Sequence, residues 1–252
     1  MLSFFPILFY LLIYEPIVGK RDFIRFQRRI TEHPGERIRY YITTMVTLWI
    51  PTIYLLGVTI AQGLPRQSLG LNWIDPTTSA LPLWLRWLVI GLFMLYFFGV
   101  AFNLVFSRLN ADFRERLTQD SQKQPDYFPY LRPYSSKERS LWVLVSLTAG
   151  VCEELLCRAF PLLFLTSYLH NFSLVVYLMI SSVMFGLIHY YQGFNGVIKT
   201  SISGLFLALI YLSFQSILPA ILIHAVMDLM VLALPYMEKP MEEPNQDGHV
   251  RM

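Results

Sequence analysis

Cysteine is scarce in this sequence, and the positions of its two cysteines do not suit a disulfide framework. Cys152 and Cys157 are five residues apart in one apolar stretch, so on a helix they face directions about 140° apart. Neither belongs to a CxxC pair or another metal-ligand spacing. The spacing disfavours a disulfide framework and a zinc-thiolate site, and we expect both cysteines to be small apolar packing residues.

Charged residues are also few, which argues against an ordinary soluble domain. They make up 15% of the 252 residues, whereas 55% are hydrophobic, and the mean hydropathy is +0.47. Such a composition predicts an integral membrane protein in contact with the lipid bilayer, with no nucleic-acid partner. We expect an all-α, polytopic transmembrane bundle of about seven or eight spans, since each span needs about 20 residues.

Apolar stretches long enough to be spans recur along the chain. The predicted spans cover residues 2–19, 42–61, 81–106, 141–161, 172–191, 197–214 and 218–234. We expect helices to kink or end at Glu15-Pro16 and at Pro161, and a division at Pro161 would add a pass. No internal repeat or inverted pair of halves is visible, which counts against a transporter.

Basic residues concentrate on one side of this seven-span model. Nearly all of the 20 Lys and Arg residues fall in segments 20–39 and 107–139, around Lys199 or in the tail. The asymmetry predicts cytosolic basic loops, a cytosolic carboxyl terminus and an outside amino terminus. Segment 20–39 is either an amphipathic helix lying on anionic headgroups or a plain cytosolic loop. We divide the chain into spans and basic loops (1–136), a core (137–234) and a disordered polar tail (235–252).

Two carboxylates and a guanidinium lie inside the fourth apolar stretch. Each such group costs roughly 2.5 to 3.5 kcal/mol near the centre of a membrane helix. Glu154 and Arg158 stand four residues apart, close enough around a helix to pair and neutralise each other. Glu153 points about 100° away and is left free, which makes it a candidate functional residue.

Two later stretches add His189, His224 and Asp228. These residue types together suit hydrolysis: a carboxylate away from water can take a proton from an attacking water, and an imidazole can orient that water. Asp228 lies one turn after His224, where it can orient a neighbouring group. His189, His224 and Glu153 also suffice as zinc ligands, so the sequence leaves open both a zinc-bound water and a metal-free, Glu-activated water.

Each of these residues also has a structural interpretation. His189 taken alone is more often an interfacial or packing residue, and Glu154 with Arg158 suits a structural ion pair. Phe185 is more often lipid-facing or a core residue than a substrate contact. His33, His170 and His249 lie in polar or connecting stretches, and we assign them no role. The combination on three separate apolar stretches is what favours a site.

The order E-E-x-x-x-R, F-x-x-x-H and H-x-x-x-[N/D] resembles the CAAX prenyl endopeptidase and bacteriocin-processing family (CPBP, also called Abi) of intramembrane proteases. The motif residues are Glu153-Glu154 with Arg158, Phe185 with His189, and His224 with Asp228. The similarity spans about residues 137 to 234. It implies a helical membrane protein that hydrolyses peptide bonds of membrane-anchored protein or peptide substrates, in eukaryotic members those of prenylated CAAX carboxyl termini.

The resemblance also implies roles for these residues. Glu153 would be the general base, His189 and His224 would hold the attacking water or a zinc ion, and Asp228 with His224 would help to stabilise the oxyanion. Glu154 and Arg158 would hold the site together. The better-known prenyl endopeptidases have Asn where this chain has Asp228, and an ionised Asp cannot donate to an oxyanion. A non-proteolytic immunity or scaffold protein of the same family is the alternative, and an ion carrier is a third hypothesis.

Overall fold

The computed structural model describes residues 2–33, 35–74, 79, 81–113, 127–169 and 171–233. Every regular element in these ranges is helical, as the sequence predicts. The α-helices are α1 (Phe5–Phe9), α2 (Lys20–Arg29), α3 (Glu36–Ala61), α4 (Leu83–Leu109), α6 (Phe128–Leu131), α7 (Ser136–Glu154), α8 (Phe160–Tyr168), α9 (Leu174–Ile188), α10 (Gly193–Phe214) and α11 (Leu218–Leu229). The predicted tail, residues 235–252, lies outside the described residues.

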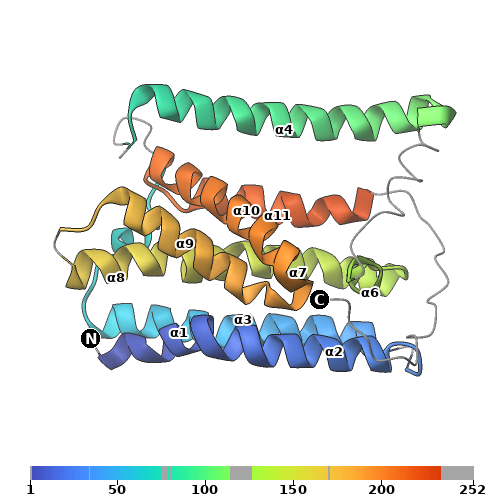
Figure 1. The fold of residues 1–252 in the computed structure, drawn as a ribbon, viewed down its shortest axis with the longest axis horizontal. Helices are drawn as coiled ribbons and strands as arrows, with labels where there is room; N and C mark the ends of the chain where they lie inside the picture. The colour runs from blue at the N-terminus through green and yellow to red at the C-terminus, as the bar shows by residue number, and fades with distance from the viewer. Residues whose placement is uncertain are drawn as a thin grey trace.

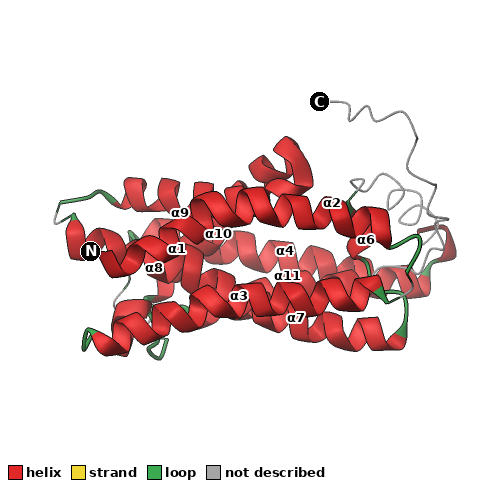
Figure 2. Ribbon diagram, turned by 90° about the horizontal axis from the view of Figure 1, so that it is seen from below, coloured by secondary structure: helices red, strands yellow, loops and turns green. Residues whose placement is uncertain are grey.

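The helices run roughly along one axis and stack in layers (Figures 1 and 2). In Figure 1, α1, α2 and α3 form one outer layer, α4 forms the opposite one, and α7 to α11 lie between them. The helix α4 packs on α10 but leaves large apolar side chains such as Trp84, Leu95 and Phe98 exposed. An exposed apolar surface of this kind is what a lipid-facing helix presents.

Five helices within the described ranges are long and apolar enough to cross a membrane: Leu2–Arg29, Glu36–Ala61, Leu83–Asn103, Ser136–Tyr168 and Tyr190–Phe214. Leu174–Ile188 and Leu218–Leu232 are apolar but shorter. The seven helices correspond to the seven predicted stretches. The number of passes and the side of each terminus stay predictions, because the two shorter helices fall below the length of about 20 residues that a bilayer requires.

Neither Pro16 nor Pro161 ends its helix. Pro16 lies inside a π-helical segment, Tyr10–Gly19, and a second one, Leu155–Ala159, ends two residues before Pro161. A proline ring clashes with the carbonyl four residues earlier in a regular α-helix, and the wider π-helical turn relieves that clash. Residues 136 to 168 therefore form one continuous helix, and no additional pass arises at Pro161.

Side chains of α9 satisfy the backbone carbonyls that this irregular turn leaves without regular partners. Pro161 has no N–H to donate to the carbonyl of Cys157, and the Ser181 hydroxyl donates to that oxygen at 2.7 Å. The hydroxyl of Tyr177 donates to the carbonyl of Arg158 at 3.4 Å. Both hydroxyl-bearing residues are fully buried, so α9 is joined to the acidic helix by hydrogen bonds at the depth of the site.

Part of the basic segment after the first span is a helix rather than a plain loop, and its place on the headgroups stays a prediction. It forms α2, and the side chains of Phe23 and Phe26 are almost completely buried. Their rings pack on Tyr40 and Tyr191, with centroids 4.3 Å apart for Phe26 and Tyr40 and 5.0 Å apart for Phe23 and Tyr191. Protein therefore covers Phe23 and Phe26, whereas Ile24 and the charged side chains of α2 stay exposed.

Small residues set how closely the central helices approach. A Cβ atom at Gly150 on α7 would lie 2.9 Å from the carbonyl oxygen of Ile221 and 3.1 Å from the Cβ of Ala225, both on α11. A Cβ at Gly204 on α10 would lie 3.1 Å from the Phe185 side chain. Gly204 therefore allows α10 to pack closely on α9. Gly150 brings α7 and α11 together one turn before the acidic pair.

We expect the replacement Ser181→Ala to lower the free energy of unfolding by about 1 kcal/mol, because the carbonyl of Cys157 loses its donor in a buried, proline-containing turn. Thermal unfolding in detergent measures the loss. Ser182→Ala is the matched control, since the Ser182 hydroxyl bonds only to Leu178 of its own helix. Equal effects of the two replacements would contradict the role given to Ser181.

Candidate functional site

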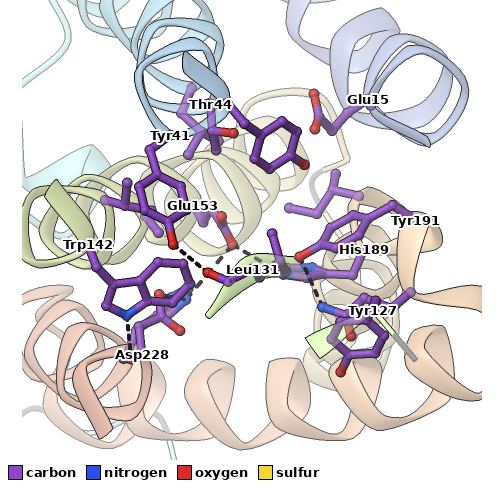
Figure 3. A pocket seen from close by; sticks show the side chains of 18 of the residues that line it. Glu15, Tyr41, Thr44, Tyr127, Leu131, Trp142, Glu153, His189, Tyr191 and Asp228 are labelled. Carbon is purple, nitrogen blue, oxygen red and sulfur yellow. Dashed lines mark hydrogen bonds and ion pairs between the residues drawn. The ribbon is translucent and has the colours of Figure 1, made fainter. Parts of the chain in front are cut away.

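A cavity of about 280 Å³ inside the bundle is lined by polar residues from both halves of the chain. Glu153 reaches it from α7, His189 from the end of α9, and His224 and Asp228 from α11. The three predicted polar stretches therefore meet at one place, as expected. Figure 3 shows the wall completed by Glu15, Tyr41 and Thr44, which come from the first two long helices, and by Tyr127 and Leu131 beside α6.

Glu153 lies between the two imidazoles. Its side chain is 11% exposed, and its Oε2 atom is 3.8 Å from His189 Nε2 and 3.9 Å from His224 Nε2. Within the described part of the chain, this oxygen is buried and has no hydrogen-bond partner. The sequence predicts that Glu153 does not share the ion pair of its neighbour, and the structure confirms this. Three polar atoms thus face one another across distances too long for direct hydrogen bonds.

His189 is oriented by the end of its own helix. The backbone N–H of His189 bonds to Gly186 rather than to Phe185, and His189 Nδ1 lies 2.8 Å from the carbonyl oxygen of Phe185. Because a carbonyl only accepts, Nδ1 carries the hydrogen, and in the neutral ring Nε2 is the free acceptor. A carbonyl at the helix terminus therefore turns the basic nitrogen of His189 toward Glu153.

A carboxylate orients His224 in the same way. Its Nδ1 atom lies 2.8 Å from Glu154 Oε1, so Nδ1–H donates to Glu154 and Nε2 faces the cavity. Asp228 Oδ2 lies 3.8 Å from the same Nε2 atom. The side chain of Asp228 is 34% exposed, against 7% for His224. Asp228 is therefore placed to act on the cavity side of the ring, where Glu153 also lies.

The ion pair between Glu154 and Arg158 is confirmed. Arg158 Nη1 is 3.0 Å from Glu154 Oε1, and both side chains are completely buried. The same oxygen accepts from His224, so one carboxylate atom serves both the guanidinium and the imidazole. The central guanidinium carbon of Arg158 lies 4.0 Å from the centroid of the Phe185 ring, a cation–π contact.

Phe185 packs beneath the site and is not lipid-facing, since only 4% of it is exposed. Its ring centroid is 4.6 Å from that of His189 and 5.6 Å from that of His224. With Arg158 on another side of the ring, Phe185 contacts three of the predicted residues at once. The structural role expected for this residue accounts for its position in the motif.

Residues that the motifs do not include also hold the site. The indole Nε1–H of Trp142 on α7 donates to the backbone carbonyl of Asp228 at 3.0 Å. The ring of Tyr41 packs edge-on against Trp142 at 5.3 Å, and its hydroxyl donates to the carbonyl of Leu131 (Figure 3). Nothing in the sequence singles out these aromatic residues, because their partners lie about 90 residues away along the chain.

The predicted zinc ion has no preformed ligand set among the described residues, since no three His, Cys, Asp or Glu side chains are grouped to share one metal. Glu153, His189 and His224 face one another without forming such a group. The cysteines are free and buried, in agreement with their expected packing role. The zinc ion stays a prediction, and we derive no chemical step through it. Of the histidines given no role, His33 is exposed outside the cavity, and residues 170 and 249 lie outside the described ranges.

Comparison with known families adds one match. Residues 135–230 match the family model described as type II CAAX prenyl endopeptidase Rce1-like. The matched range contains all the site residues described above from Glu153 to Asp228, whereas the first helices that line the cavity lie outside it. No curated protein and no solved structure matches the chain.

We expect Arg158→Met to lower the free energy of unfolding by about 3 to 5 kcal/mol, because it leaves the buried carboxylate of Glu154 without its main counter-charge. Thermal unfolding in detergent again measures the loss. Arg25→Met is the control, because the pair of Arg25 with Asp22 is exposed and contributes at most about 1 kcal/mol. An Arg158→Met variant as stable as the control would contradict the structural role of the buried pair.

Proposed function

Residues 135–230 of this chain belong to the Rce1-like family of type II CAAX prenyl endopeptidases, and from this premise we propose that the protein is an intramembrane endopeptidase. In this proposal it hydrolyses peptide bonds of membrane-associated substrates, prenylated CAAX-type carboxyl termini among them. The observation that supports it most directly is the approach of Glu153 Oε2 to the Nε2 atoms of His189 and His224, at 3.8 and 3.9 Å, in a buried cavity.

Glu153 is the general base in this mechanism. Its Oε2 atom makes no hydrogen bond within the described part of the protein, so it is available to accept a proton from a water molecule. The Nε2 atom of His189 is an acceptor in the neutral ring and can take a hydrogen bond from the other hydrogen of the same water. The oxygen of that water attacks the carbonyl carbon of the scissile bond while its proton moves to Glu153.

The tetrahedral intermediate carries negative charge on the former carbonyl oxygen. In this proposal His224 carries a proton on both ring nitrogens before the water attacks: Nδ1–H donates to Glu154 and Nε2–H donates to the oxyanion. Glu153 afterwards gives its proton to the leaving nitrogen, and the peptide bond breaks. Glu154 and Arg158 take no part in the chemistry, but they fix the imidazole that does.

Asp228 acts through His224 in this scheme. An ionised carboxylate cannot donate to an oxyanion, but at 3.8 Å from His224 Nε2 it attracts the positive charge that the ring carries in the intermediate. Asp228 is therefore proposed as a positioning residue rather than an oxyanion donor. This role differs from that of the Asn found here in the better-known prenyl endopeptidases.

We expect Glu153→Gln to lower kcat/KM for a membrane-anchored, prenylated peptide by at least about 10²- to 10⁴-fold, the usual contribution of a general base. Purified protein in lipid and a panel of lipidated and unlipidated peptides provide the assay. Glu32→Gln is the matched control, because Glu32 is exposed between α2 and α3, away from the cavity.

Full proteolysis by folded Glu153→Gln would contradict the mechanism. A folded wild type that cleaves no peptide of the panel would instead favour the non-proteolytic family alternative. The same assay with a chelator tests the predicted zinc ion: activity lost with chelator and restored by Zn²⁺ indicates a metal-bound water, and activity retained indicates the Glu-activated one.

An amide and a methyl group at position 228 should affect kcat/KM differently, because only the amide can donate to the oxyanion. We expect Asp228→Asn to keep kcat/KM within about tenfold of wild type, because the amide can donate directly, and Asp228→Ala to lose about 10²- to 10³-fold. Steady-state kinetics on one peptide measures both variants. Equal losses in the two variants would contradict direct donation by the amide.

A further inference from the structure

Besides Glu153 and Asp228, a third carboxylate lines the same cavity, and the proposed mechanism gives it no role. Glu15 reaches the cavity from the first long helix, which the family match does not include. In Figure 3 its side chain comes from a different helix than Glu153 and lies on another part of the wall. Glu15 belongs to the apolar segment Leu2–Arg29, one of the helices long enough to cross a membrane.

The helix is built locally to hold this carboxylate. Glu15 lies in the π-helical segment Tyr10–Gly19, immediately before Pro16. One turn later, a Cβ atom at Gly19 would lie only 2.7 Å from Glu15 Oε1. Only a glycine leaves this space open without displacing the carboxylate. Gly19 also lines the cavity, so the carboxylate is held against the helix at the cavity wall.

No cation within the described residues compensates Glu15. Its ionisable neighbours include Tyr10, Tyr40 and Asp22. Arg132 also lines the cavity, but none of the ion pairs found in these residues includes Glu15. Inserting an uncompensated carboxylate into a membrane helix costs roughly 2.5 to 3.5 kcal/mol. Glu154 offsets this cost through Arg158, whereas Glu15 has no equivalent partner, so a functional reason for its presence is required.

The neighbours of Glu15 suit a positively charged ligand. Tyr10 and Tyr40 line the cavity with it, and each stacks one ring face on another aromatic residue, Tyr14 and Phe26 respectively. The faces of phenol rings attract cations, and a carboxylate beside such rings adds both charge and hydrogen-bond acceptors. An ammonium or guanidinium group would therefore find acceptors and aromatic faces at the same place.

We propose that Glu15, with the rings of Tyr10 and Tyr40, forms a subsite for a basic side chain of the substrate peptide. The inference rests on the proposed function, since it places the lysine or arginine on the peptide whose scissile bond lies at Glu153. Because both carboxylates line one cavity of about 280 Å³, the basic residue stands within a few residues of the cleaved bond. The subsite selects the substrate by charge, and the residues of the family motifs cleave it.

Binding to the Glu153→Gln protein in lipid nanodiscs tests the subsite without cleavage. The probes are two fluorescent, prenylated peptides that are identical except for lysine or the uncharged, similarly shaped norleucine near the scissile bond. We expect the lysine peptide to bind at least about tenfold more tightly, and addition of Glu15→Gln to abolish this preference. Addition of Glu32→Gln serves as the control and preserves it.

Two further variants distinguish loss of the subsite from a folding defect. Gly19→Ala keeps the charge but displaces the carboxylate, and we expect it also to weaken the preference for lysine. Glu15→Asp retains a carboxylate, and we expect it to restore part of the preference that Glu15→Gln abolishes. Thermal unfolding in detergent confirms that each variant is folded.

Equal affinities for the two peptides, or a lysine preference that survives Glu15→Gln, would overturn the subsite. Cleavage by the wild type is measured in parallel and concerns the proposed function alone. Charge-selective binding without cleavage would support the subsite and contradict the endopeptidase. Cleavage without charge-selective binding would support the endopeptidase and overturn the subsite.

Discussion

A single buried oxygen, Glu154 Oε1, is the point on which the geometry of the site depends. It lies 3.0 Å from Arg158 and 2.8 Å from His224, so it compensates a guanidinium of its own helix and orients an imidazole of another. In the low-dielectric interior, loss of either interaction would cost free energy, because the remaining group would be buried without a partner. Because breaking the contact would leave a buried charge without a partner, Glu154 holds His224 in one rotamer with Nδ1 protonated.

The packing of α7 and α11 has to be close for this interaction to form. Gly150 allows that approach, with the carbonyl of Ile221 so near that a methyl group would not fit. The π-helical turn before Pro161 then carries Arg158, and Ser181 on α9 satisfies the carbonyl that the proline leaves without a donor. The same helix α9 ends at His189. A proline, a glycine and a serine with no chemical role thereby set the positions of the polar groups.

The cavity is a product of both halves of the chain, although only the second half carries recognisable motifs. The tyrosines and the carboxylate of the first helices line the cavity together with the imidazoles. Tyr41 packs on Trp142 and bonds to Leu131 of α6. The family match over residues 135–230 therefore covers the motif residues and leaves out part of the cavity wall.

Local spacing was enough to predict much of this protein. Composition indicated a helical membrane bundle, the four-residue separation of Glu154 and Arg158 predicted their pairing, and the angle between adjacent side chains predicted that Glu153 would stay outside the pair. All of these depend on the geometry of one helix, which the sequence determines directly. The contacts between helices could not be predicted in this way. Three of them depend on how closely distant helices pack: the bond of Glu154 to His224, the bond of Trp142 to the end of α11, and the position of Glu15 in the cavity. This packing is decided jointly by small residues and side-chain volumes throughout the bundle.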